Sequence, residues 1–333
     1  MKVRFALLAL TVALSGVVVA VGCGDDDGPM PMVDAGDGTM DAGPGMTDGA
    51  LPPPACPPLA PPPDNQMGSC CWRASNASQL TAPELRLAGL KINNPASLGS
   101  TIIRGLLQGA FDEERFNWLV RVEGAPATGM GPIMIKTGLG FRDPAGTFAY
   151  AMNNAPMPGA LDRWDPKSFA GTMDGETFSA PRTSEVITLP IFSQPDDAGV
   201  TSILFELPLR NLEMLPSTLS EDRSCVGLRN PASYDTMSGH LRAYLTVADT
   251  SAARLDVSSI HATICMLIAG MSSMMGNCSD YPQSGWMVKP DSLCDAAGCI
   301  SNRATPGTCM PDTTCNAWEL NADFAAQGVS ITN

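Results

Sequence analysis

Apolar and polar residues alternate along much of the chain after Leu85, which is the pattern of β-strands with one buried face. Clusters of Gly, Pro, Asn and Asp separate the alternating stretches. The predicted strands cover residues 85–92, 116–122, 133–138, 147–152, 185–192, 202–209, 240–247 and 318–324. Pro190 and Pro208 favour edge positions or bulges, because proline has no backbone N–H to donate to the neighbouring strand that a central strand would have on each side. We therefore predict a mainly β fold, an antiparallel β-sandwich or barrel.

A helical period replaces the alternation over residues 98–111. Apolar residues recur there at the spacing of one helix face. The preceding Asn94 is expected to cap this helix, with Pro95 in its first turn. Gly105 and Gly109 each weaken a helix by about 1 kcal/mol relative to alanine, so we expect a neighbouring segment to pack closely over them.

A second amphipathic helix is predicted over residues 257–268. Apolar residues again recur at the spacing of one helix face, and Gly270 is positioned to end the helix. Asp256 or Ser258 is expected to cap its start. The fold class is thus a β-rich domain with two amphipathic helices.

The chain begins with a positively charged segment followed by an apolar run. Lys2 and Arg4 precede the run, which covers residues 5–21 and has the length of a signal sequence. It closes on the sequence AVGC at residues 20–23. This sequence resembles the lipobox of bacterial lipoproteins, which implies that Cys23 is acylated and becomes the first residue of the mature chain. An ordinary secretory signal or an uncleaved anchor is the alternative.

The segment after Cys23 has the composition of a tether. Residues 24–66 contain no Lys, Arg or aromatic residue and are rich in Asp, Gly and Pro, so they cannot bury enough apolar surface to offset the entropy of ordering. Prolines after Leu51 favour a stiffer polyproline II spacer.

These features divide the chain into three parts. We predict a signal peptide over residues 1–22, a lipidated Cys23 with a disordered tether over residues 23–66, and one β-rich domain over residues 67–333. The lipobox resemblance implies an extracytoplasmic chain whose partner is the bacterial membrane, reached through the acyl anchor. Gly24 is not the Asp associated with inner-membrane retention in some bacteria, so we expect the outer membrane.

The acidic balance of the chain comes partly from the tether. The whole chain has 34 acidic and 20 basic residues. Eight of the acidic residues lie in the tether and two of the basic residues in the signal, which leaves 26 acidic and 18 basic residues in the domain. This mild acidity argues against nucleic acid as a partner.

Ten cysteines remain after Cys23, an even number that in an exported chain indicates disulfides. The disulfide candidates are Cys56, Cys70, Cys71, Cys225, Cys265, Cys278, Cys294, Cys299, Cys309 and Cys315. Residues 278–315 are dense in cysteine and turn residues, which indicates loops held together by disulfides. Their spacing lacks the paired CxxC of a zinc ribbon, so we expect no metal and no cofactor.

The stretch NQMGSCCWR at residues 65–73 is similar to the sequence around the nucleophile of papain-type thiol proteases. That chemistry needs a His and an orienting Asn. His261 is the candidate His, but Pro290 occupies the position that matches the Asn. We therefore interpret Cys70 and Cys71 as structural half-cystines bonded to two different partners.

Few other residues suggest chemistry. His240 is expected in a strand and His261 on a helix, and neither accompanies a Gly-x-Ser-x-Gly sequence. The acidic run at residues 112–114 offers paired carboxylates for glycoside chemistry, or simply a solvated surface. Trp164 lies in a polar stretch, where it either stacks on a sugar or packs a loop against the core.

The leading functional hypothesis is a non-catalytic, tethered extracytoplasmic lipoprotein for ligand binding, adhesion or envelope structure, with a protein, glycan or lipid ligand left open. One alternative is a lipid carrier, because the order strand, helix, strands, helix is similar to that of tubular lipid-binding domains. The other is a secreted hydrolase that uses His240 or His261.

Overall fold

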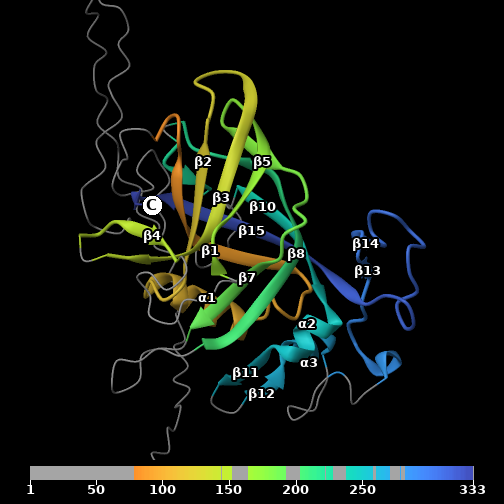
Figure 1. Ribbon diagram of the computed structural model, residues 1–333. Coiled ribbons are helices and arrows are strands. Elements are labelled where there is room, and N and C mark those ends of the chain that lie inside the picture. The colour runs from red at the N-terminus through yellow and green to blue at the C-terminus, as the bar shows by residue number, and fades with distance from the viewer. Residues whose placement is uncertain are drawn as a thin grey trace, which may run out of the picture. The chain divides into compact units, whose positions relative to one another are not determined.

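A closed ring of antiparallel strands forms the centre of the protein (Figure 1). The computed structural model describes residues 79–143, 145–151, 164–192, 203–221, 223–227, 238–257, 260–270, 278 and 282–332. The ring strands, in their order around the sheet, are β1 (Glu84–Asn94), β2 (Asn117–Glu123), β3 (Met130–Arg142), β5 (Lys167–Asp174), β6 (Thr177–Ala180), β8 (Ile203–Thr218), β10 (Gly239–Thr246) and β15 (Ala317–Gly328). The predicted mainly β, antiparallel fold is confirmed, in its barrel form.

The strand that closes the ring is β1, because it has partners on both sides. Leu85 lies opposite Val120 of β2 and opposite Gly328 of β15. Two register shifts interrupt the pairing of β1 with β15, and such bulges bend a strand and increase its twist. The bent β1 thereby joins the first and last strands of the ring.

Alternate side chains of the ring strands point into its interior. Those of β15 are at most 3% exposed and come from Trp318, Leu320, Ala322 and Phe324. On the neighbouring β10, Leu245 lies opposite Trp318 and is equally buried. The interior of an eight-stranded ring is just wide enough for side chains to fill, so the predicted alternation over residues 318–324 marks the core correctly.

Shorter strands lie outside the ring. Those that belong to the same sheet are β4 (Phe148–Tyr150), β7 (Ile187–Phe192), β9 (Cys225–Val226), β13 (Ser292–Asp295), β14 (Gly298–Ser301) and β16 (Ile331–Thr332). A separate two-stranded sheet is formed by β11 (Arg254–Val257) and β12 (Ile260–Thr263). Among the described strands, β7 pairs with β8 alone, and its partner residues are the first half of β8. Pro190 and Pro208 both lie in this ribbon, as the edge prediction required.

Strands β5 and β6 carry little of the alternating pattern, and the sequence pattern did not assign them. The inward residues of β5 include Gly171 and Met173, whereas its outward residues are small, such as Ala170 and Thr172. Because the inward and outward residues of these strands differ little in hydrophobicity, they produce only a weak period-two pattern in the sequence. Their pairing with β3 and β8 was therefore visible only in the folded chain.

The first predicted helix is α1 (Thr101–Asp112), and its apolar face packs against the core. Its N-cap is Ser100, not Asn94, which ends β1 and donates a hydrogen bond to the Glu319 carbonyl oxygen. Among the described residues, a Cβ built at Gly105 meets nothing within 4 Å, so the expected close neighbour is absent there, whereas one built at Gly109 lies 3.7 Å from the Arg115 side chain. Gly105 lies on the exposed side of the helix.

The second predicted helix is much shorter than the pattern indicated. The helix α3 (Ile264–Ala269) follows the hairpin β11–β12, and Thr263 rather than Asp256 or Ser258 caps it. Its end at Gly270, which has a φ of 67°, is as predicted. A further short helix, α2 (Val247–Ala252), follows β10. In the described ranges, no helix is both long and apolar enough to cross a bilayer.

Three disulfides hold the C-terminal part of the chain, so the predicted disulfide-rich segment is confirmed. The pairs are Cys265–Cys278, Cys294–Cys299 and Cys309–Cys315. Cys225 is also disulfide-bonded, and its partner lies outside the described residues, as do Cys23, Cys56, Cys70 and Cys71. Disulfides of this density are typical of a chain outside the reducing cytoplasm.

We expect Gly105→Ala to stabilise the domain by about 0.5–1 kcal/mol, because alanine favours the helix and the added Cβ has open space. The matched control is Gly140→Ala, whose Cβ would overlap the Leu119 side chain and lie 2.9 Å from the Ala149 carbonyl oxygen. This control is expected to lose about 1–3 kcal/mol. Urea unfolding of both variants measures the difference, and equal stabilities would contradict the packing described for the two sites.

Candidate functional site

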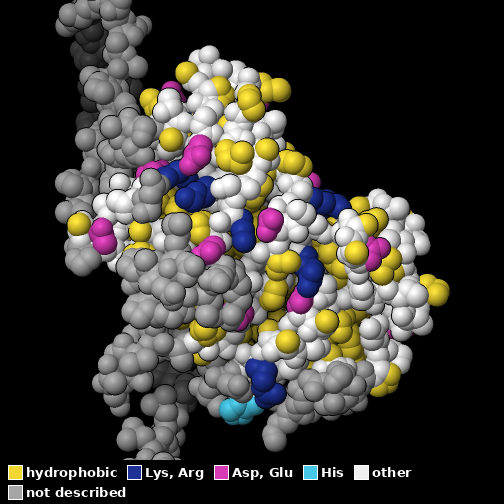
Figure 2. All heavy atoms as spheres, in the orientation of Figure 1, with side chains coloured by type: hydrophobic (Ala, Val, Ile, Leu, Met, Phe, Trp, Pro, Cys, Tyr) yellow, Lys and Arg dark blue, Asp and Glu magenta, His cyan; other side chains and the backbone are white. Residues whose placement is uncertain are grey.

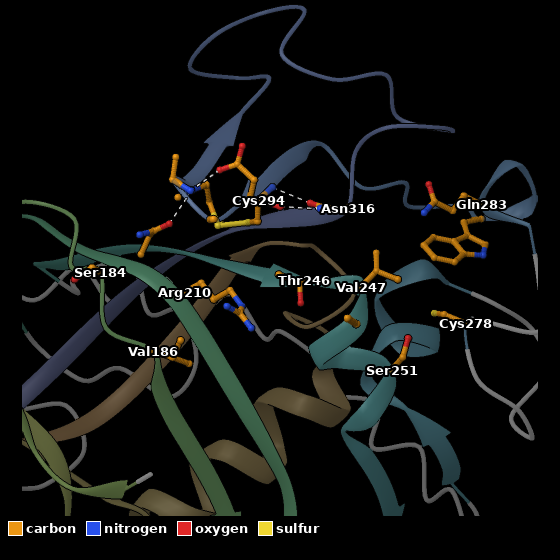
Figure 3. A pocket seen from close by; sticks show the side chains of 18 residues that line it. Ser184, Val186, Arg210, Thr246, Val247, Ser251, Cys278, Gln283, Cys294 and Asn316 are labelled. Carbon is orange, nitrogen blue, oxygen red and sulfur yellow. Dashed lines mark hydrogen bonds between the residues drawn. A yellow bond between two sulfur atoms is a disulfide. The ribbon is translucent and has the colours of Figure 1, made fainter.

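An open groove of about 970 Å³ lies beside the middle of β8 and the end of β10 (Figure 3). One wall is the disulfide-bonded β13–β14 hairpin, and the other comes from β8 and the start of α2. A volume of this size falls in the range of small-molecule sites. The lining residues that matter below are Ser184, Arg210, Asn211, Ser251, Gln283 and Asp295.

A bulge in β8 directs side chains into the groove. Residues up to Leu209 pair with β7, whereas residues from Arg210 onward pair with β10. At this change two residues of β8, Asn211 and Leu212, lie opposite the single residue Ala243 of β10, and Asn211 takes a left-handed φ of 48°. Asparagine tolerates this conformation better than most residues. Figure 3 shows Arg210 pointing from β8 toward Thr246.

Arg210 is held by a bidentate ion pair with Asp249 of α2. Its Nε and Nη2 atoms lie 2.7 and 3.1 Å from the two carboxylate oxygens. Hydrogen bonding to Asp249 raises the pKa of Arg210. Burial opposes ionisation of Asp249, but hydrogen bonds from Arg210 and Thr246, together with the positive charge, lower its pKa. The guanidinium is therefore fixed in orientation.

Two asparagines cap the main chain of the hairpin wall. The Asn211 side chain accepts a hydrogen bond from the Cys299 N–H at 2.7 Å and donates to the Thr183 carbonyl at 3.0 Å. Asn316 accepts from the Cys294 N–H at 2.7 Å and donates to its carbonyl at 2.8 Å. The Cys294–Cys299 disulfide joins the two capped residues. This wall is rigid, and its main-chain groups at these two positions are already paired.

Tryptophan stacking supports the floor of the groove. Trp286 is 4% exposed and stacks on Trp318 of β15, with ring centroids 5.8 Å apart. In the described part of the chain, the Trp286 Nε1 and the Gln283 Oε1 are buried without a hydrogen-bond partner. Buried polar atoms of this kind mark places where a ligand or water supplies the missing bond.

The sequence left two interpretations of Trp164 open, stacking on a ligand or packing a loop against the core, and the structure favours the second. The Trp164 side chain is 4% exposed, so its ring faces are not available to a ligand. Its Nε1 donates to Glu206 at 2.8 Å, and its ring meets Phe192 edge-on. Trp164 instead packs a loop against the β7–β8 ribbon.

The two histidines lie apart from the groove lining. His240 is in β10, as predicted, and its Nδ1 lies 2.8 Å from the Asp323 carboxylate. The nearby Ser217 hydroxyl is fully buried and bonds to main-chain groups. His261 lies in strand β12, not on the predicted helix. Neither position brings a histidine, a serine hydroxyl and an acid into a described triad.

The acidic run at residues 112–114 forms surface pairs. Asp112 accepts from Gln108 at 3.0 Å, and Glu113 pairs with Arg115 at 2.7 Å. Glu114 pairs with Arg142 at 3.2 Å. These carboxylates are thus spread along the exposed end of α1, which is the solvated-surface interpretation.

Two voids among the core side chains are small and apolar. Their volumes are about 50 and 30 Å³, and residues such as Leu90, Phe116 and Leu207 line both. Ligand pockets usually measure about 300–1,000 Å³. Neither of these two voids has room for an acyl chain.

Sequence reasoning missed Arg210, Asn211 and Asp249, although one signal was present. Apolar residues recur every second position up to Leu209, and the next inward residue is Leu212. A slip of one residue in a period-two pattern is the mark of a bulge. The ion pair itself had no sequence signal, because 39 positions separate Arg210 from Asp249.

Removing the Asn211 amide should loosen the hairpin wall. We expect Asn211→Ala to lose about 2–3 kcal/mol, because the buried Cys299 N–H loses its partner and alanine disfavours the left-handed φ. The Asn211→Gly variant loses the same hydrogen bonds, but glycine adopts the left-handed φ without the cost that alanine incurs. It should therefore be about 1 kcal/mol more stable than the alanine variant. Urea unfolding and amide exchange at Cys299 measure both. Unchanged exchange at Cys299 in both variants would show that Asn211 does not hold the hairpin.

The Arg210–Asp249 pair predicts an acid-sensitive contribution to stability. Because the folded-state pKa of Asp249 is below its ordinary value of 3.8, the pair stabilises the fold above that pH and is lost as the pH falls through the folded-state pKa. The stability difference between the native chain and Asp249→Asn should therefore shrink between pH 6 and pH 2.

The control is Asp312→Asn, because Asp312 forms an exposed pair with Lys289. It should change stability little at either pH. If the stability difference between the native chain and Asp249→Asn stays constant from pH 6 to pH 2, the described ion pair is contradicted.

Comparison with known proteins adds no assignment to this geometry. No protein-family model, curated protein or solved structure matches the chain. The groove is therefore described by its own residues: an oriented Arg210, a capped hairpin wall, and buried polar atoms that lack partners.

Proposed function

We propose that the chain is a bacterial lipoprotein, acylated at Cys23 and tethered outside the cytoplasm, whose β-rich domain binds a ligand in the groove without chemically changing it. The N-terminal residues that resemble a lipobox and the acidic, proline-rich segment after them support the anchor and the tether. The three disulfides fit an oxidising compartment. The outer membrane is the proposed location, because Gly24 follows Cys23.

The observation that carries the binding role is the preformed groove. Its volume is about 970 Å³, its hairpin wall is cross-linked, and its Arg210 side chain is oriented by an ion pair. Sites that hold ligands are usually formed before the ligand arrives, because a rigid site loses less entropy on binding. The cross-linked hairpin wall and the oriented Arg210 are features of a preformed site of this kind.

The alternatives fit the described geometry less well. A lipid carrier needs an elongated apolar cavity, whereas two apolar voids among the described core side chains measure only about 50 and 30 Å³. A hydrolase needs a nucleophile within reach of a base, whereas the His240 ring pairs with Asp323 on a surface away from the groove lining.

On the face shown in Figure 2, the acidic and basic side chains of the described residues are interspersed and do not form separate positive and negative patches.

Mass spectrometry of the mature protein tests the anchor. We expect a chain that begins at Cys23 and carries acyl chains, and we expect Cys23→Ser to release the protein from the membrane fraction, because a chain without acyl groups has no comparable apolar anchor. Alkylation without reduction should leave the six paired cysteines of the C-terminal part unlabelled. An unacylated Cys23 in membrane-bound protein would contradict the proposal.

A further inference from the structure

The described lining of the groove has no net charge. Among the described lining residues, Arg210 is the one cation and Asp295 the one anion. Because Asp249 already pairs with Arg210 at 2.7 Å, a ligand carboxylate or phosphate would meet an occupied guanidinium and a second acid nearby. An anionic ligand is therefore disfavoured by electrostatics. A neutral ligand meets no such penalty.

The unpartnered groups of the groove suit hydroxyls. Arg210 Nη1 makes no hydrogen bond within the described part of the chain, and it can donate. The Gln283 side chain also lines the groove, and its amide can both donate and accept. Ser184 and Ser251 contribute hydroxyls to the lining. A hydroxyl both donates and accepts, so one kind of ligand group satisfies donors and acceptors alike.

An extended peptide is the less suitable neutral ligand. Peptides bind sheet proteins mainly by adding a strand to a free main-chain edge. In the groove, the main chain at Cys294 is capped by Asn316, and the Cys299 N–H is capped by Asn211. The Cys299 carbonyl also accepts from Arg182 at 2.9 Å. The hairpin wall thus offers side chains rather than a strand edge.

We infer that the groove binds a neutral oligosaccharide, with Arg210 donating to sugar hydroxyls and Asp249 acting as the residue that positions Arg210. Val186, Val247 and Ala248 also line the groove and can contact the C–H faces of sugar rings. The inference deepens the proposed ligand-binding function and rests on it. It names the ligand class that the lining selects.

Binding is tested with the mature full-length chain, in a detergent that has no sugar headgroup. The probes are maltotriose, cellotriose and chitotriose, with trigalacturonate as the anionic counterpart and N-acetyl-trialanine amide as the peptide. Isothermal titration calorimetry measures affinity, and saturation-transfer NMR identifies the bound probe. We expect at least one neutral trisaccharide to bind, and to bind more tightly than the anionic probe and the peptide.

Three variants locate the binding site. Arg210→Gln should weaken trisaccharide binding by tenfold or more, because it removes charge-assisted hydrogen bonds. Ala297→Trp fills the groove from the exposed hairpin tip without touching the ion pair, and should abolish binding. The control Lys289→Gln removes a cation that is not part of the lining and should leave affinity unchanged.

Each outcome decides the inference. Trisaccharide binding that the two groove variants weaken and the control spares supports it. No binding of any neutral trisaccharide overturns it, as does binding that Ala297→Trp leaves intact. The peptide or trigalacturonate could instead bind more tightly than every neutral trisaccharide, and Ala297→Trp could abolish that binding. This result overturns the neutral oligosaccharide as the ligand but leaves the proposed ligand-binding function standing. The state of Cys23 is measured independently of all these results.

Discussion

The whole structure depends on the pairing of β1 with two strands that lie far from each other in the chain. Because β1 joins both β2 and β15, the eight ring strands have no free edge between them. Closure removes the unpaired N–H and C=O groups that make open sheets prone to association. It also fixes which face of every ring strand points inward, since a slip of one residue would turn each side chain to the other face.

Closure also determines where the remaining segments go. The interior is filled by side chains such as Trp318 and Leu320, so helices and short hairpins must leave the ring at strand ends. In Figure 1, the hairpin β13–β14 and the helices α2 and α3 leave on the same side. The groove forms where these insertions meet the bulged part of β8. Its rigidity therefore comes from the ring, the disulfides and the asparagine caps together.

The alternating pattern identified the strands whose two faces differ strongly in polarity. It did not assign β5 and β6, where small residues such as Ala170 and Thr172 face outward. It also extended the helix before Gly270 too far, because Val257 and Ile260 fit a helical period by chance and pair instead across the hairpin β11–β12. Short apolar stretches satisfy both periods, and tertiary pairing then decides between them.

The sequence alone determined the fold class, the approximate positions of six of the eight ring strands, the disulfide-rich segment and the end of α3, because each depends on residue period or composition within a short window. Only the tertiary structure determined the groove. Its main parts come from Thr183, Arg210, Asp249 and Cys299, which the folded chain joins by hydrogen bonds across 28 to 88 positions. Contacts of that separation leave no periodic trace in a sequence, because they exist only once the closed sheet has brought the strand ends together.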